Sequence, residues 1–324
     1  MAGQGAMGSD MQREPSGLLW IRREIDENLR QTRLLLEDFA EGETRDLGAA
    51  ITALHQVWGA LLVAQVHGGA MLADELERLA RALHEQAVAD PEGAAESLMV
   101  GIAQLPAYLE RVEGGQPDIP LVLMPLMNEL RAARGAPPVS ETGLFAPRLA
   151  AQLEAEPVRP GSGNPELPRR AARLRREYHL GLLRWLREQQ PDAAIKSLRG
   201  VIDQLASLAG TERMRRLLDA ADALLLAASD GEVEHSAAVK RLYGRLDRVI
   251  KRLIAAGEET VAADFPIALY REFLYHIARS TSRDPVIEAV RKAADLANSF
   301  PEDAAADPGD PLGAGRELFE QVAA

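Results

Sequence analysis

The residue whose type and position could do chemistry most directly is His55, which lies within an apolar helical pattern and has Gly59 four positions later. At 3.6 residues per turn the two lie on one helix face, and the glycine leaves out a side chain beside the imidazole ring. Helical-wheel geometry places His55 about a quarter turn from the apolar stripe, so we expect a half-exposed ring. An accessible imidazole is a nucleophile that can accept a phosphoryl group, and a structural histidine flanking the core fits the same pattern.

Metal binding is an alternative raised by two further histidines, His67 and His84. Their spacings form no i, i+4 pair with His55 or with each other, and the chain has no cysteine, so no metal site of the usual kind is predicted. No phosphate-binding loop, kinase signature or serine-nucleophile elbow occurs either, so we expect no catalytic residue and no cofactor. The acidic side chains on the next expected helix are typical of a solvated face: Asp74, Glu75 and Glu77.

Helices must position His55, because apolar residues recur every three or four positions throughout residues 17–135. We expect four helices, with Gly68 and Gly69 at the turn between the second and third and with Pro106 kinking the fourth. A short fifth helix should end at a basic last turn followed by the Gly135 cap. The stripes begin at Leu18, Leu47, Leu72, Leu98 and Leu123. This pattern predicts a helical bundle.

A second bundle of about six helices is predicted over residues 165–299, where the same periodicity returns. The stretch 136–164 between the bundles is rich in proline and is expected to be a linker. Residues 1–16 and 300–324 have the composition of a disordered leader and a flexible tail. The fold class is therefore all-α, with two bundles joined by a Pro-rich linker.

Composition and charge narrow the classes of function. Ala, Leu, Arg and Glu dominate and aromatics reach only 4%, which favours helices over strands. The net charge of −12 argues against a nucleic-acid partner. No apolar run is long enough to insert into a membrane, so we expect a soluble cytoplasmic protein.

The two bundles differ in charge. Residues 17–135 hold 10 basic and 19 acidic residues, whereas residues 165–299 hold 23 basic and 19 acidic residues, so the two bundles could offer different surfaces to partners. The basic opening of the second bundle could dock an acidic partner or serve only solubility: Arg169, Arg170, Arg173, Arg175 and Arg176.

The residues around His55 resemble the motif of the histidine-phosphotransfer (Hpt) domain, H-x-x-K-G on the second helix of a four-helix bundle. Glu77 occupies the place of an acidic residue that ends a leucine-rich pattern on the next helix of that family. Trp58 stands where the family has a lysine that helps to hold the phosphoryl group, and no charge replaces it. The resemblance implies an Hpt-like bundle that carries only half of the phosphotransfer motif.

A longer resemblance covers nearly all of residues 17–299. Four segments are similar to the FimL-type region of pilus chemosensory systems, which occurs as a separate scaffold and as the N-terminal part of the large histidine kinase ChpA: Leu19–Ile25, Leu54–Val57, Gln104–Leu109 and Pro125–Gly135. The second bundle resembles that family's second domain by helix pattern. When aligned on Leu208-Ala209-Gly210, its histidine position falls near Gly200, so this bundle resembles a degenerate copy without a phosphoacceptor.

This resemblance implies a role in type IV pilus control, twitching motility and cyclic-AMP signalling through protein contacts. Our leading hypothesis is a non-enzymatic scaffold that binds proteins of the pilus chemosensory system, namely a kinase, a receiver or a polar scaffold protein, and is recruited to the cell pole. Two alternatives stay open. One is a phosphotransfer protein with His55 as the phosphoacceptor, and the other is the N-terminal part of a ChpA-like hybrid histidine kinase.

Overall fold

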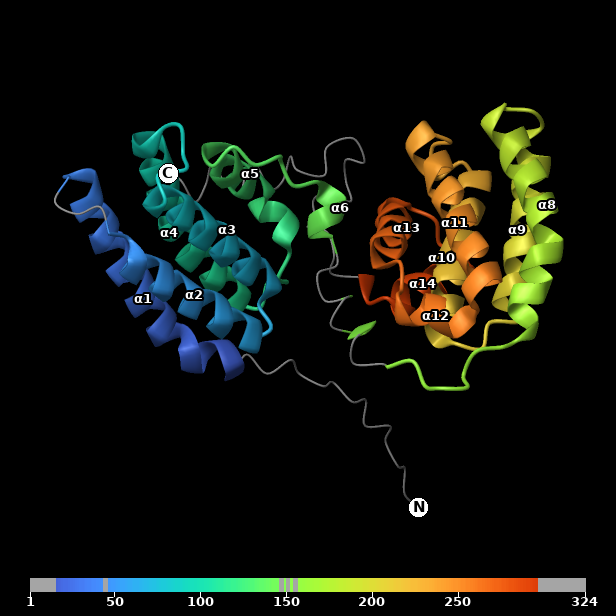
Figure 1. The fold of residues 1–324 in the computed structure, drawn as a ribbon, viewed down its shortest axis with the longest axis horizontal. Coiled ribbons are helices and arrows are strands. Elements are labelled where there is room, and N and C mark those ends of the chain that lie inside the picture. The colour runs from blue at the N-terminus through green and yellow to red at the C-terminus, as the bar shows by residue number, and fades with distance from the viewer. Residues whose placement is uncertain (1–15, 43–45, 146–148, 150–151, 154–156, 297–324) are drawn as a thin grey trace, which may run out of the picture. The chain divides into compact units, whose positions relative to one another are not determined.

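The computed structural model describes residues 16–42, 46–145, 149, 152–153 and 157–296, with side chains from residue 21 onward. These residues form two compact units, unit 1 up to Val139 and unit 2 from Ser140 onward (Figure 1). The described ranges contain helices and turns but no β-strand, so the all-α prediction is confirmed. Its Hpt-like character stays a prediction. The regions expected to be a leader and a tail lie outside the described residues, apart from Ser16.

Unit 1 is a bundle that positions His55. In chain order its helices are α1 Ser16–Ala40, α2 Gly48–Val63, α3 His67–His84, α4 Pro91–Glu113, the 3-10 turn η1 Pro120–Leu123 and α5 Met124–Ala133. Helix α1 packs on α2 and α4, and α3 packs on the same two helices, which closes the bundle, while α5 covers α3 and α4. As expected, Gly135 adopts a positive φ of 68°, and the amide of Ala136 donates to the carbonyl of Arg131 at 2.8 Å, which is a glycine C-cap.

The turn between α2 and α3 differs from the prediction. Gly68 and Gly69 lie inside the first turn of α3, and the chain reverses before them, where Gln65 has a φ of 60°. The Asp118 carboxylate requires glycine at position 68. It accepts hydrogen bonds from the amides of His67 at 2.6 Å and Gly68 at 2.9 Å, and a Cβ on Gly68 would lie only 2.6 Å from its Oδ1. Gly68 is therefore a close-packing residue at a capped helix start, not a turn residue.

Unit 2 is a second bundle, built around α10. Its helices are α6 Glu141–Leu144, α8 Glu166–Leu186, α9 Pro191–Ala206, α10 Glu212–Ser229, α11 Ala237–Ala256, α12 Glu258–Ala263, α13 Ile267–Arg279 and α14 Pro285–Ala293. Helix α10 packs on α9, α12, α13 and α14, while α8 packs on α9 and α11. Edge-to-face ring contacts join Trp185 to Tyr243 at 5.3 Å and Tyr243 to Phe273 at 5.4 Å, which links α8, α11 and α13.

Part of the segment expected to be a linker packs within unit 2. Leu144 and Phe145 are buried, and the Phe145 ring contacts the Tyr275 ring of α13 edge-on at 5.6 Å. The Tyr275 hydroxyl also donates to the carboxylate of Glu141. Proline content correctly marks a break in helical periodicity. It does not show whether apolar residues within that break pack against a bundle.

A buried carboxylate, Glu258, holds three segments of unit 2 together. Its side chain accepts hydrogen bonds from the amides of Asn164 at 2.7 Å, Gly210 at 3.2 Å and Thr211 at 2.7 Å. The Thr211 hydroxyl donates a fourth, at 2.8 Å. A Cβ on Gly210 would lie 2.8 Å from the Asn164 nitrogen, so this close approach requires glycine. The start of α12, the loop before α10 and the residues before α8 are thereby joined.

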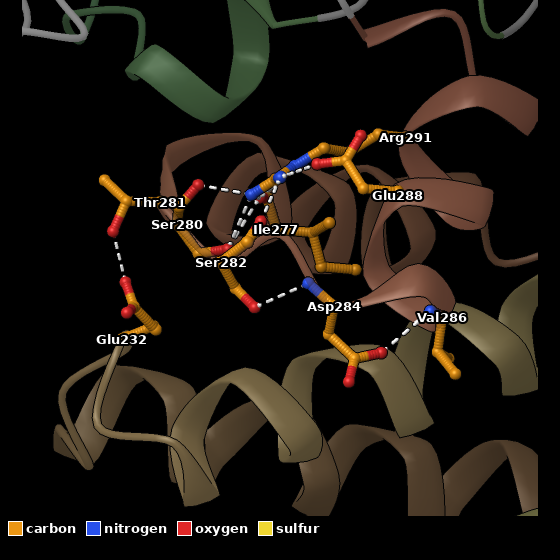
Figure 2. A network of polar contacts seen from close by, with 9 residues as sticks. All are labelled: Glu232, Ile277, Ser280, Thr281, Ser282, Asp284, Val286, Glu288 and Arg291. Atoms are coloured by element: carbon orange, nitrogen blue, oxygen red, sulfur yellow. Dashed lines mark hydrogen bonds and ion pairs between the residues drawn. The ribbon is translucent and has the colours of Figure 1, made fainter.

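The guanidinium of Arg291 fixes the loop between α13 and α14 (Figure 2). It donates to the carbonyl oxygens of Ile277 at 3.0 Å and Ser282 at 2.5 Å, and also to that of Ser280. The Asp284 side chain accepts from the amide of Val286 at 2.8 Å and caps α14. Helix α14 is thus held at its start by Asp284 and near its end by Arg291.

None of the helices in the described ranges combines the length and the apolar character that crossing a bilayer requires.

Candidate functional site

Helix α2 presents His55 to solvent because the residues beside it anchor the opposite face of the helix. Leu54 and Val57 are completely buried in the core of unit 1. The His55 side chain is 60% exposed, in agreement with the half-exposed ring that the helical wheel predicts. The α2 periodicity therefore determines which way the imidazole faces.

Helix α3 supplies the partner of the imidazole. The Nδ1 atom of His55 lies 3.0 Å from Oε2 of Glu77, which is 12% exposed and accepts from Arg81 through its other oxygen at 2.6 Å. Because a carboxylate only accepts hydrogen bonds, the neutral imidazole carries its proton on Nδ1 and leaves Nε2 with a free lone pair. Glu77, which the sequence placed at this position by resemblance, thus orients the ring.

Trp58 and Gly59 form the surface next to the ring. The centroids of the His55 and Trp58 rings are 5.1 Å apart, with the planes tilted by 35°. A Cβ at Gly59 would meet nothing within 4 Å, so packing does not require glycine there. The glycine leaves the surface beside His55 open to an incoming protein.

Chemically, this arrangement has an oriented nucleophile without a positioned cation. A phosphoryl group on histidine carries about two negative charges near neutral pH and needs a nearby positive group. Arg81, the cation beside Glu77, is paired with that carboxylate at 2.6 Å, and Glu77 itself places negative charge 3.0 Å from the ring. Among the described residues, the contacts of the His55 ring are therefore a carboxylate and an aromatic ring.

The acidic run on α3 is not the solvated face that the sequence suggested. Glu75 is buried, and its carboxylate pairs with Arg131 at 2.6 Å and with Arg134. Arg131 lies on α5 and Arg134 directly follows its last residue, and both belong to the segment Pro125–Gly135 that carries much of the resemblance stated above. Buried ion pairs of this kind fix which helix faces meet, and this one attaches α5 to α3.

The two other histidines of unit 1 are used within the fold. His67 begins α3, where its amide is bound by Asp118, and the His84 ring accepts from the amide of Leu47 at 3.3 Å. Among the residues that the structure describes, no three His, Asp or Glu side chains gather as a metal-binding group.

Unit 2 contains a polar cluster that sequence reasoning missed. His179 lies half exposed on α8, with Nε2 2.6 Å from Asp247 of α11, and Arg175 donates to both oxygens of the same carboxylate. Partial burial opposes ionisation of Asp247, but the hydrogen bonds from Arg175 and His179 outweigh it and hold its pKa below the usual range. The i, i+4 spacing of Arg175 and His179 was the available signal, but their partner lies 68 positions or more away.

Both units are similar in sequence to known proteins. Residues 163–307 match the family model for the FimL scaffold protein second domain, beginning at the segment that Glu258 binds. The sequence of unit 2 is therefore similar to the FimL second domain over most of its length. The whole chain is 30% identical over 290 residues, 87% of its length, to the scaffold protein FimL of Pseudomonas aeruginosa. The FimL-type resemblance is confirmed, and the chain spans about half the length of that relative. No solved structure matches the chain.

Proposed function

We propose that this chain is a non-enzymatic, cytoplasmic scaffold of a type IV pilus chemosensory pathway. The observation that carries the proposal is the match of unit 2 to the FimL second domain, together with 30% identity across most of the chain to a protein named as a scaffold. The FimL-type resemblance of unit 1 extends the proposal to the pathway. Its partners are the kinase, receiver or polar scaffold proteins of that system, and binding them recruits the chain to the cell pole.

The face around His55 is the proposed docking surface of unit 1. It combines an exposed imidazole, an open position at Gly59 and a part-exposed indole at Trp58. Aromatic and histidine side chains with both polar and apolar parts are common in protein contacts. The net charge of −9 on residues 17–135 adds an electrostatic component, so binding should weaken with salt.

Capture of the pathway proteins from the native host tests the scaffold role. Tagged full-length chain should retain kinase or receiver proteins of the pilus system at low ionic strength and lose them at high ionic strength. Gly59→Lys should abolish capture by unit 1, whereas Glu96→Lys, at an exposed position on α4, should not. Normal twitching in a deletion strain together with no captured pathway protein would contradict the proposal.

A phosphotransfer role is the second candidate, favoured by the exposed Nε2 and by the Glu77 hydrogen bond. Removing one positioned charge-stabilising group commonly costs a factor of about 10² to 10³ in rate, so Trp58 should leave transfer too slow to signal. Incubation with a phosphorylated receiver or a kinase domain, followed by measurement of acid-labile phosphate, compares wild type, His55→Gln and Trp58→Lys. We expect label only on Trp58→Lys. Rapid labelling of wild type that disappears in His55→Gln would replace the scaffold proposal with a relay.

A further inference from the structure

Helix α8 carries a basic and apolar stripe on its outer face. At 100° per residue, six side chains fall within about 100° of the helix circumference: Arg173, Arg176, Leu180, Leu183, Arg184 and Arg187. Leu180 is 47% exposed and Leu183 42% exposed. Glu177 is the acidic residue that borders this stripe. We refer to these six residues as the α8 stripe.

The arginines of the α8 stripe differ from their neighbours on the same helix. Arg170 donates to Gln204 and Arg175 to Asp247, so these two hold the bundle together. No ion pair or hydrogen bond within the described residues engages the side chain of Arg173 or Arg176. The sequence alone could not separate these two groups, because both belong to one basic run.

Unit 2 also carries a groove of the opposite charge. The groove has a volume of about 490 Å³ and is lined by residues of α9, α10, α13 and α14, helices whose arrangement in unit 2 Figure 1 shows. Its floor is apolar, formed largely by Tyr270, Val286 and Val290. Its rim carries the carboxylates of Asp203, Glu212, Asp219 and Asp222 and one guanidinium, that of Arg216, which pairs with Glu212.

Asp219 is the half-buried carboxylate of the groove that no described residue pairs with, and Asp203, the other unpaired carboxylate, is exposed. Arg199 holds Asp222 through both oxygens at 2.9 and 3.0 Å, and Glu212 accepts from arginines on its own helix. No hydrogen bond or ion pair in the described part of the chain reaches Asp219. Its burial and the acidic groups around it raise its pKa despite the field of Arg215. A cation from outside the unit would relieve this repulsion.

We propose that the α8 stripe of one copy of this chain docks in the acidic groove of a second copy. Leu180 and Leu183 cover the apolar floor, and the arginines of the stripe pair with Asp219 and Asp203 on the rim. Because the two surfaces are different parts of unit 2, the contact is head-to-tail, so a pair of copies still offers one free groove, on the first copy, and one free stripe, on the second. The scaffold would then assemble into chains or closed rings.

Both surfaces are preformed, which lowers the entropy lost on binding. The inner face of α8 is anchored by the buried side chains of Tyr178 and Trp185. On the other side, Arg291 and the Asp284 cap hold α14, the wall that carries Val286 (Figure 2). The matched signs and matched apolar centres of two rigid surfaces favour a second copy over a lipid bilayer, which would use only the stripe.

Paired variants of the full-length chain test the contact by sedimentation velocity. Arg173→Glu/Arg176→Glu destroys the stripe but leaves the groove, and Asp203→Lys/Asp219→Lys destroys the groove but leaves the stripe. Ala289→Lys, at an exposed position on α14, is a second groove variant that leaves the half-buried Asp219 in place. Arg241→Glu on α11 and Glu96→Lys on α4 are matched charge-reversal controls at exposed positions that belong to neither surface.

We expect wild type and both controls to self-associate as concentration rises, and more weakly in high salt. Each stripe or groove variant alone should associate at least about tenfold more weakly, since it loses two ion pairs and part of an apolar contact. A stripe variant mixed with a groove variant should form a 1:1 complex that grows no further, because only one complementary pair of surfaces remains. A monomeric wild type, or variants that associate as wild type does, would overturn the proposal. A wild type that instead binds anionic vesicles through the stripe without self-association would do the same.

Discussion

Replacing Glu258 by glutamine probes how strongly one buried carboxylate organises unit 2. The side chain is 3% exposed and accepts four hydrogen bonds, two at each oxygen. In Glu258→Gln one oxygen becomes an NH2 group, which cannot accept. Whichever way the amide is oriented, two donors on Asn164 and Gly210, or both donors on Thr211, lose their acceptor.

The magnitude follows from those two lost bonds. A hydrogen bond to a charged acceptor contributes about 1.5–3 kcal/mol to stability. The neutral glutamine side chain costs less to bury than a carboxylate, which offsets part of the loss. Taking the lower end for each bond, we expect the free energy of unfolding of unit 2 to fall by about 3 kcal/mol. For a unit of this size the midpoint should fall by about 6–12 °C.

Fluorescence of Trp185 reports on unit 2 alone once the other two tryptophans, Trp20 and Trp58, are replaced by phenylalanine. Trp185 is completely buried, so its emission shifts when unit 2 unfolds. Glu259→Gln is the matched control, because the adjacent carboxylate accepts one hydrogen bond, from the amide of Gly163 at 3.1 Å, and its loss should cost under about 1.5 kcal/mol. Equal midpoints for Glu258→Gln and Glu259→Gln would refute the reasoning.

Two further changes test other polar contacts of unit 2. The depressed pKa of Asp247 means that its carboxylate stabilises the folded unit above the pKa of unfolded aspartate, and that this stability is lost as pH falls through the lower folded pKa. Asp247→Asn should therefore flatten the loss of stability below about pH 4, measured by urea unfolding at a series of pH values. Arg291→Met should lower the free energy of unfolding by about 2 kcal/mol, because carbonyl oxygens of the loop before α14 lose their donor; an unchanged urea midpoint would show that water replaces the guanidinium.

Helix positions could be predicted from the sequence because helical periodicity is local. The stripes that begin at Leu47 and Leu72 correspond to α2 and α3, and the exposed place of His55 follows from its angle to Leu54 and Val57. The Gly135 cap was predictable for the same reason, since a positive φ after a basic last turn is decided within a few residues.

Residues joined over long distances could not be predicted in this way. Gly68 was expected at a turn because nothing near it in sequence shows that Asp118, 50 positions later, binds its amide. Glu75 was expected on a solvated face because its partners Arg131 and Arg134 lie more than 50 positions later, at the end of α5. The apolar residues around Phe145 were expected in a linker because their partner Tyr275 is far along the chain.

By itself, then, the sequence determined the all-helical class, most helix positions, the orientation of His55 and the kinship with FimL-type proteins. Only the tertiary structure decided the Glu258 junction, the Asp247 cluster, the separation of structural from free arginines on α8, and the acidic groove. The physical reason is that α-helical hydrogen bonds close within four residues, so local pattern suffices to describe them. A buried carboxylate or guanidinium, by contrast, binds whichever distant backbone groups the packed helices leave without partners, and this depends on the whole arrangement of the unit.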